Sequence, residues 1–355
     1  MQRLVTLVHT GAQGQLSPNW DKNFLLNPGF RISQSPLGSS FNFAASTVAL
    51  LQYTLDQWLA AFTPDGGTTA AAVVSRQNFV LGQGVVAREP VNFLRVQNST
   101  VGVNLGVNSF HNIIQRMEGV RTLAGEVVTL SFWAQSSIPN KVLGIYFLQS
   151  FGSGGTPSNT VGLVGGSCVL STSWQKFTLT ARIPTLAGKV LGTNGDDHLA
   201  VIFVLQGGAT IIDPLCRTTG GIAWGGTGTV DFANIQLEMG STDSDFFVRP
   251  PEVDLLRCRR FYYYQANSQH AWYAIDATYL EGSNFFPTPM RIPPSLRFTS
   301  NAGGTLGLMH TVSGVVVNDI GGSPSTHGVT ELYSGANRLS VGGIYYGFME
   351  ANARL

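Results

Sequence analysis

Residues 127–134, Val127-Val-Thr-Leu-Ser-Phe-Trp-Ala134, alternate along the chain in a way that decides the fold class. In an extended chain, one face of this segment carries Val128, Leu130, Phe132 and Ala134. The same two-residue period occurs in 174–183 and 231–239, whereas 199–205 is continuously apolar. Alternation of this length predicts half-buried β-strands, and an uninterrupted apolar run of this length predicts a central strand that is covered on both faces. Gly-rich turns separate the predicted strands, which favours a β-sandwich or barrel.

The composition excludes several classes of protein. Among 355 residues only 12% are charged, 42 are glycine and 43% are apolar. Few charged helix formers argue against long amphipathic helices, and the apolar content is too high for intrinsic disorder. The net charge of +1 gives no general electrostatic reason to expect a nucleic-acid partner. No run of eighteen apolar residues exists, so we expect no insertion into a membrane.

Turn-rich and proline-rich stretches divide the chain into four parts. Residues 1–22 are predicted to form an extended arm, and 23–250 a β domain. Residues 251–264 are predicted to be a linker or short helix, because a stiff Pro-Pro pair precedes them. Strand patterns resume beyond this point, and 265–355 is therefore predicted to be a second, smaller β domain.

The common catalytic motifs are absent, and we predict that the chain is not an enzyme. There is no P-loop, Gly-x-Ser-x-Gly elbow, His-Glu-x-x-His or Cys-x-x-Cys motif. The adjacent acids Asp196 and Asp197 follow Asn-Gly and are interpreted as turn formers, since such side chains bond to local backbone. The odd number of cysteines, Cys168, Cys216 and Cys258, argues against a disulfide framework and favours folding in a reducing cytoplasm.

Asp231 is the carboxylate with the most unusual predicted position. It has the same parity as Ala233, Ile235 and Leu237, so a regular strand would point it into the core. A buried carboxylate needs a hydrogen-bonding, ionic or metal partner. Two interpretations stay open: a structural calcium ion held with Asn27, or hydrogen bonds from nearby loop amides. No motif requires any other cofactor.

Trp133 and Trp174 are the candidates for contact with a glycan. Both lie on the Ser/Thr-bearing face of their predicted strands. Exposed aromatic rings on a sheet can stack on sugar rings through the electron-rich π face. The alternative is that a partner sheet, a loop or another subunit covers this face.

The segment Arg257-Cys-Arg-Arg-Phe-Tyr-Tyr-Tyr264 mixes cations with aromatic rings. Such a mixture could bind nucleic acid, but the surrounding chain is neutral. We therefore predict a packed element between domains or subunits, with arginines stacked on tyrosines. The residues assigned to this packing are Arg257, Arg259, Arg260, Tyr262 and Tyr263.

An ordered set of short motifs resembles a family of tail-fibre and related virion proteins of tailed bacteriophages. The resemblance covers roughly residues 23–355. The motifs in order are Asn27-Pro-Gly-Phe30, Tyr53-x-x-Asp56-x-Trp58, Gln115-Arg-Met-Glu-Gly-Val120, Leu130-Ser-Phe-Trp-Ala134, Trp174-Gln-Lys-Phe177, Leu191-Gly-Thr-Asn-Gly-Asp-Asp197, Val230-Asp-Phe-Ala-Asn-Ile-Gln-Leu-Glu238, Phe246-Phe-Val-Arg-Pro250, Leu256-Arg-Cys258-Arg-Arg, Pro289-Met-Arg-Ile-Pro-Pro294 and Ala351-Asn-Ala-Arg-Leu355.

This resemblance implies an all-β protein in which a jelly-roll β-sandwich like that of carbohydrate-binding modules leads into a smaller C-terminal β-sandwich. It further implies a homotrimeric tail fibre or receptor-binding protein that attaches to a host-surface polysaccharide. Residues 1–22 lie outside this resemblance, and we predict that they attach the protein to tail or baseplate proteins after assembly in the host bacterial cytoplasm. The alternatives are a structural adaptor, head fibre or decoration protein without a ligand, and a glycan-degrading tailspike, which would need two carboxylates across a groove.

Overall fold

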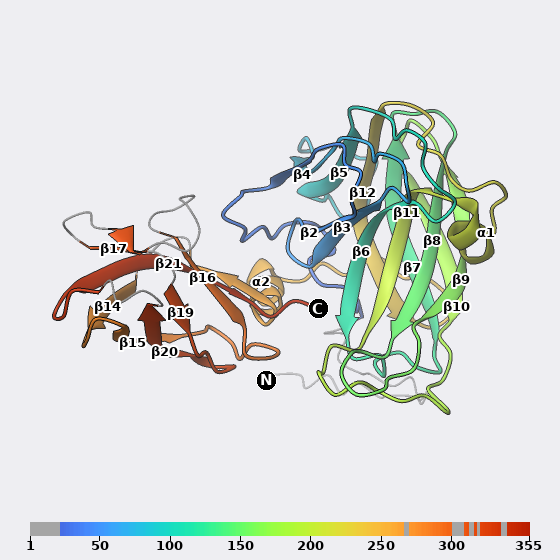
Figure 1. The fold of residues 1–355 in the computed structure, drawn as a ribbon. Helices are drawn as coiled ribbons and strands as arrows, with labels where there is room; N and C mark the ends of the chain where they lie inside the picture. Colours follow the sequence, from blue (N-terminus) through green and yellow to red (C-terminus); the bar gives the residue numbers. More distant parts are fainter. Residues whose placement is uncertain (1–21, 266–269, 300–308, 312–315, 318–319, 335–338) are drawn as a thin grey trace, which may run out of the picture.

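The computed structural model describes residues 22–265, 270–299, 309–311, 316–317, 320–334 and 339–355, so the predicted arm at 1–22 lies almost wholly outside the described residues. The first part of the chain forms two antiparallel sheets packed face to face (Figure 1). The first sheet contains, in spatial order, β1 (Ser40–Phe43), β4 (Ala72–Asn78), β5 (Asn92–Asn98), β12 (Gly228–Met239), β7 (Val127–Ser136) and β10 (Gln175–Arg182). The second sheet contains β2 (Leu50–Tyr53), β3 (Trp58–Thr63), β6 (Phe110–Glu118), β11 (His198–Gly207), β8 (Lys141–Ser150) and β9 (Val161–Leu170). The prediction of an all-β sandwich protein is confirmed.

The core of the sandwich lies between these two sheets. The predicted inner face of β7 is fully buried, and Phe132 from this strand packs edge-on against Phe203 of β11, with ring centroids 5.2 Å apart. Strand β11 is central in its sheet and buried on both faces, as its unbroken apolar sequence predicts. Its odd-numbered residues from Leu199 to Leu205 face the core, and Ala200, Ile202 and Val204 face outward.

The short helix α1 (Ala209–Cys216) covers the outer face of the second sheet at β9 and β8. Its buried side chains, Ile212 and Cys216, pack onto that face together with Ile222. At Gly144 of β8, a Cβ atom would lie 2.7 Å from the Cys216 Sγ and 2.6 Å from the Ile222 Cδ1. Glycine at this position therefore allows the close approach of the helix to the sheet.

Lys141 is buried at one end of the sandwich, and no acidic side chain among the described residues pairs with it. Its Nζ donates hydrogen bonds to the carbonyl oxygens of Leu205 and Ala223, both at 2.5 Å, and lies 5.3 Å from the centre of the Trp224 ring. Burial lowers the pKa of Lys141 from 10.5 to about 7. The same burial, with the nearby Lys141, holds the pKa of His111 well below its usual value. This end of the core therefore disfavours positive charge.

Protonation of Lys141 gives an expected pH dependence of stability. Between pH 7 and 10.5 the unfolded chain keeps the proton that the folded chain has lost, so the free energy of unfolding from this group rises with pH across that window. We expect Lys141→Met to flatten this rise. Urea unfolding at pH 6.5, 8 and 9.5 measures the free energy of unfolding of both proteins. Subtracting one value from the other at each pH removes the contribution of groups that titrate alike in both. An equal rise in the two proteins would contradict the assignment.

The C-terminal part is one branched sheet built around β21 (Ile344–Asn352). Along its length β21 pairs with β13 (Tyr262–Tyr264) and β14 (His270–Ala274) on one side, and with β16 (Ser295–Thr299) and β17 (Met309–Thr311) on the other. The remaining strands are β15 (Tyr279–Phe285), β18 (Val316–Val317), β19 (Ile320–Gly322) and β20 (Gly328–Ser334). All of these strands belong to a single sheet, and its strands β16 and β19 contact each other around a common core. The smaller β-sandwich that we predicted is therefore one curved sheet and not two separate sheets.

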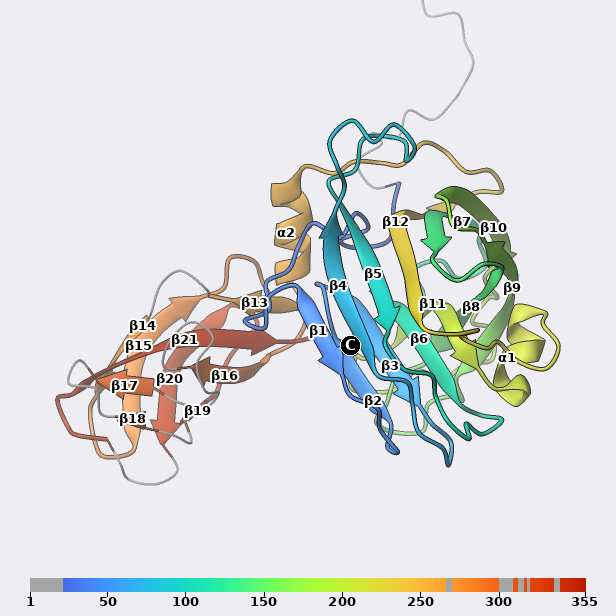
Figure 2. The ribbon, with the colours of Figure 1, turned by 90° about the horizontal axis from the view of Figure 1, so that it is seen from above.

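The two parts are joined by helix α2 (Pro251–Arg259) and by a return contact from the end of the chain (Figure 2). The predicted linker is thus a helix followed by strand β13 of the C-terminal sheet. Arg354 stacks between Tyr53 and Tyr262, 4.4 and 4.1 Å from their ring centres. The main-chain oxygen of Leu355 accepts hydrogen bonds from the Tyr53 hydroxyl at 2.6 Å and from Arg116 at 2.5 Å. No helix in the described part of the chain is long and apolar enough to cross a membrane.

Candidate functional site

A β-bulge in β12 determines which side chains reach the outer face of the first sheet. Ala233 pairs with Trp133 and Gln236 with Ser131, so β12 contains one more residue than β7 across this interval. Asn234 within the bulge has a φ of 47°. Before the bulge Val230 and Phe232 point into the core, and after it Ile235 and Leu237 do. The predicted inward orientation of Asp231 is therefore wrong. The prediction assumed strict alternation from Asp231 to Leu237, and the extra residue in the bulge reverses which positions face the core.

Asp231 instead lies in a polar row on the outer face of β5, β12 and β7. Its two carboxylate oxygens accept hydrogen bonds from Arg95 Nε and Nη2, both at 2.8 Å, and from Gln135 at 3.0 Å. These bonds raise the pKa of the Arg95 guanidinium above its ordinary value. The Asp231 carboxylate is buried beneath its partners, whereas 31% of the Arg95 side chain is exposed. An ion pair thus satisfies this carboxylate, where the sequence suggested calcium or loop amides.

Asn27, the other predicted calcium ligand, belongs to a separate network of hydrogen bonds. Its side-chain amide donates to the carbonyl oxygens of Ile32 at 2.8 Å and Asp56 at 3.1 Å, and its side-chain oxygen accepts from the Ile32 amide at 2.9 Å. Within the described part of the chain, Asn27 and Asp231 share no hydrogen-bonding partner. Among the residues that the structure describes, no group of three or more His, Cys, Asp or Glu side chains could hold a metal ion. The calcium ion stays a prediction of the sequence.

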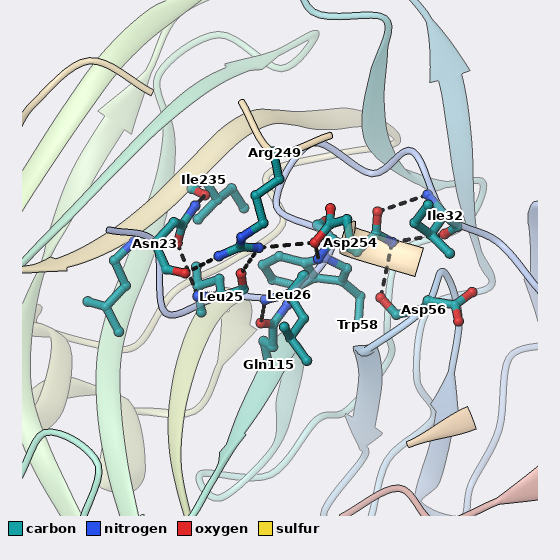
Figure 3. Close-up of polar contacts among 12 residues, drawn as sticks. Asn23, Leu25, Leu26, Ile32, Asp56, Trp58, Gln115, Ile235, Arg249 and Asp254 are labelled. Carbon is teal, nitrogen blue, oxygen red and sulfur yellow. Dashed lines mark hydrogen bonds and ion pairs between the residues drawn. The ribbon is translucent and has the colours of Figure 1, made fainter. Parts of the chain in front are cut away.

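The network around Asn27 is centred on a buried ion pair that closes one end of the sandwich (Figure 3). Arg249 Nη1 lies 3.0 Å from Asp254 Oδ1 and donates to the carbonyl oxygen of Leu25 at 2.9 Å. Arg249 Nη2 donates to the carbonyl oxygen of Asn23. The Asn27 backbone amide also donates to Asp254, at 3.3 Å. These bonds fasten the first described residues and helix α2 to the same end of the sandwich, so the role of Asn27 here is structural.

Trp133 and Trp174 come together in an aromatic cluster beside the polar row. Both are half-buried, and both pack against the buried Phe93 and Ala233 on the outer face. The ring centroids of Phe79 and Trp174 are 5.3 Å apart, and those of Phe93 and Trp174 are 5.5 Å apart in an edge-to-face arrangement. The sequence had indicated the two tryptophans but not the two phenylalanines. Phe93 has the same parity as Arg95, which is the signal that would have placed it on this face.

The loop that joins β4 to β5 lies against the aromatic cluster. Val86 from this loop is buried against the cluster, and the Phe79 amide donates to the Val91 carbonyl oxygen at 2.9 Å to close the loop. In contrast, Leu81 is 90% exposed and Val80 is also exposed. A loop therefore covers part of this face, as the alternative interpretation of the tryptophans predicted, but Trp133 and Trp174 are both still partly exposed.

We define the outer-face site as Arg95, Asp231, Gln135, Trp133 and Trp174. Within it, planar polar groups lie beside half-buried aromatic rings. Ring faces contact the C–H surface of a sugar, while guanidinium and amide groups bond its hydroxyls in fixed directions. The hydrogen bonds among Arg95, Asp231 and Gln135 fix the orientation of the polar row.

Asp196 and Asp197 lie elsewhere, in the loop between β10 and β11. Asp196 accepts hydrogen bonds from the Ser153 amide and hydroxyl at 2.7 and 2.6 Å, and Asp197 accepts one from the Val120 amide at 2.8 Å. The hydrogen bond from the Ser153 side chain lowers the pKa of Asp196, which keeps it ionised near neutral pH. These contacts are those of loop-stabilising acids. The prediction that the chain is not an enzyme stays a prediction.

The predicted packing segment lies at the junction of the two parts. Arg260 forms a bidentate ion pair with Glu118 of β6, in which Nη2 lies 2.8 Å from Oε1 and Nε lies 3.0 Å from Oε2. Arg259 lies 5.6 Å from the centre of the Tyr263 ring, and Tyr262 is buried against Arg354. Arg257 lines a cavity at the same junction. Arg260 and Tyr262 thus contact the sandwich or its C-terminal anchor, whereas the Tyr263 ring packs in the core of the C-terminal sheet, 6.2 Å from the Phe286 ring.

Comparison with known proteins gives remote likenesses only. No protein-family model and no curated protein matches the chain. Among solved structures, the chain is similar to the enzymatically active domain of bacteriophage CBA120 tailspike protein 4, at 12% identity and a TM-score of 0.31, over 62% of this chain and 22% of that one. It is also similar to a CBM4 structure, at 14% identity and a TM-score of 0.30, over 60% of this chain and 98% of that one. A third likeness is to the xylan-binding CBM22-2 domain of Paenibacillus barcinonensis Xyn10C, at 14% identity and a TM-score of 0.30, over 52% and 92% of the two chains.

Proposed function

We propose that the outer-face site binds a host-surface glycan, and that the chain is a receptor-binding protein of a bacteriophage tail fibre. The observation that carries the binding proposal is the grouping of Trp133 and Trp174 with the Arg95–Asp231–Gln135 row on one sheet face. These residues come from β5, β7 and β12 and from the turn before β10, and the pairing of these strands brings them together. Half-exposed aromatic rings beside oriented polar groups provide the two contacts that a pyranose ring needs.

The placement of the chain in a virion is supported by the ordered motifs of the sequence. In this proposal the protein is a homotrimer at the periphery of the tail or baseplate, assembled in the bacterial cytoplasm and attached through residues 1–22. Three copies of a weak sugar site would act together, because binding of one copy raises the effective concentration of the others at the cell surface. The low content of charged residues, 12%, suits surfaces that are shared between subunits.

Binding to immobilised bacterial polysaccharides tests the glycan site. We expect the wild-type chain to bind at least one polysaccharide on an array, and Trp133→Ala to weaken that binding about thirty-fold, the loss typical of a central aromatic contact. Phe285→Ala is the matched control, since Phe285 is an exposed aromatic side chain on the C-terminal sheet. This control variant should bind as the wild type does.

Two results would contradict the glycan function. One is the absence of binding to any polysaccharide or to whole host cells. The other is equal binding by wild type and Trp133→Ala. A map of the intact virion in which other proteins cover the outer face of the first sheet would instead favour a structural adaptor without a ligand.

A further inference from the structure

The ion pair between Arg95 and Asp231 balances the charge at the centre of the outer-face site. Arg95 approaches Asp231 with its Nε and Nη2 atoms, each 2.8 Å from a different carboxylate oxygen. The Asp231 side chain is 1% exposed and that of Arg95 is 31% exposed. A ligand on this face therefore meets a guanidinium group whose charge is already neutralised by the carboxylate that lies against it.

The other cation beside the site, Lys176, is neutralised in the same way. Lys176 of β10 lies opposite Trp133 in the register of β10 and β7. Its Nζ lies 2.6 Å from the Asp243 carboxylate. In the described strands β5, β12, β7 and β10, the register rows that contain Asp231 and Trp133 hold no cation besides Arg95 and Lys176. These two rows therefore carry no unpaired positive charge.

The ion pair also determines which polar atoms are left for a ligand. Arg95 uses Nε and Nη2 for Asp231, and Gln135 uses its side-chain nitrogen, 3.0 Å from the same carboxylate. Among the described residues, none forms a hydrogen bond with Arg95 Nη1 or with the Gln135 side-chain oxygen. The row thus offers one donor group and one acceptor atom beside the half-buried rings of Trp133 and Trp174.

An uncharged sugar matches these atoms better than an acidic one. A hydroxyl group both donates and accepts hydrogen bonds, so it can use the N–H groups of Arg95 and the oxygen of Gln135. A carboxylate only accepts, and Asp231 already occupies the Nε–Nη2 edge that would bind it with two parallel hydrogen bonds. An acidic sugar would also lose hydration of its charge without gaining an unpaired cation.

We propose that Asp231 is a specificity-determining residue that restricts the outer-face site to uncharged sugar units. This inference rests on the proposed glycan-binding function and names the class of sugar that the site takes. The uncharged ring lies against Trp133 and Trp174. One of its hydroxyl groups accepts a hydrogen bond from Arg95 Nη1, and another donates to the Gln135 side-chain oxygen. Asp231 excludes acidic sugars because it holds the place of their carboxylate on Arg95.

Matched polysaccharide pairs test this proposal on the full chain. Alginate, hyaluronate, polygalacturonate and each acidic polysaccharide of the array are immobilised in native form and after reduction of their carboxyl groups to primary alcohols. Reduction removes the charge and keeps the linkages. We expect the wild type to bind at least one reduced form, about ten-fold or more tightly than its native form. Added salt should leave binding of the reduced form unchanged, because neither partner contributes an unpaired charge.

The variant Asp231→Asn separates the role of the charge from that of the shape. It removes the carboxylate and keeps a side chain of the same size, so the charge of Arg95 is no longer balanced. We expect this variant to bind the native acidic forms about ten-fold more tightly than the wild type does, with binding that weakens as salt is added. Glu281→Gln is the matched control, because it removes the same charge from an exposed position on β15 and should keep the wild-type preference.

The outcomes distinguish this inference from the proposed function. Binding of a native acidic form as tightly as its reduced form, lost in Trp133→Ala, would overturn the inference and leave glycan binding in place. An unchanged preference in Asp231→Asn, shown to be folded by its thermal unfolding midpoint, would do the same. Absence of binding to every native and reduced form would overturn the proposed function and the inference with it. If Asp231→Asn does not fold, the wild-type comparison of native and reduced forms still decides.

Discussion

Replacing Asp254 with alanine is expected to lower the free energy of unfolding by about 3–5 kcal/mol, the loss typical when one partner of a buried ion pair is removed. Arg249 is almost completely buried, and Asp254 supplies its carboxylate at 3.0 Å. The variant keeps the guanidinium charge in the interior but removes the carboxylate of its ion pair, while the carbonyl oxygens of Leu25 and Asn23 still accept hydrogen bonds from it. It also removes the acceptor of the Asn27 amide. The cost is that of a buried guanidinium that has lost the carboxylate of its ion pair.

Urea unfolding followed by circular dichroism measures this effect. Asp245→Ala is the control, because Asp245 forms an exposed pair with Arg88 that should contribute no more than about 1 kcal/mol. The double variant Arg249→Met with Asp254→Leu should recover much of the lost stability, since it removes both charges together. A loss below about 1 kcal/mol in Asp254→Ala would mean that the other partners of Arg249 are sufficient to stabilise its charge.

Phe132→Ala is expected to destabilise the sandwich by about 3–5 kcal/mol, the range for removing a buried aromatic side chain. Phe132 is fully buried and packs against Phe177, Phe203 and Phe232, with centroids 5.6, 5.2 and 6.5 Å away. Two of these rings belong to its own sheet and Phe203 to the other. The truncation therefore opens a cavity at the contact between the two sheets, which the rigid strands cannot close.

Guanidinium unfolding of three proteins tests the prediction. Phe285→Ala deletes a ring that is 71% exposed and should change the free energy of unfolding by no more than about 0.5 kcal/mol. Phe132→Leu keeps most of the volume and should lie between the two alanine variants. Similar midpoints for Phe132→Ala and wild type would mean that the sheets repack around the missing ring.

Local patterns were sufficient to predict the strands that build the core. The alternation in 127–134 and the unbroken apolar run in 199–205 depend only on neighbouring residues, and the structure confirms the burial of both. The orientation of Asp231 was predicted wrongly because the bulge at Asn234 inserts one residue, and nothing in the alternation from 231 to 239 marks the insertion. The branching of the C-terminal sheet around β21 also depends on pairings that a local pattern does not contain.

The candidate site was predictable residue by residue but not as a group. Trp133 and Trp174 were recognisable from parity and residue type. Their association with Arg95 was not, because Arg95 and Asp231 are 136 residues apart and meet only through the strand order β5-β12-β7. The cavity at the junction could not be predicted either, because its lining combines residues from Phe24, β6 and the end of α2. The Arg257–Arg260 segment was recognised as a packing element, but its partner Glu118 lies 142 residues away from Arg260.

The stacking of Arg354 between Tyr53 and Tyr262 has a mechanical consequence. Strand β21 pairs with four other strands of its sheet and runs to Asn352, two residues before Arg354. A pull on the C-terminal sheet therefore passes along its central strand into the sandwich, in parallel with the pull through α2. With two such anchor points the C-terminal sheet cannot swivel about the helix without drawing the guanidinium out from between the rings. The two attachment points therefore restrict rotation of the C-terminal sheet relative to the sandwich, which a single helical connection would allow.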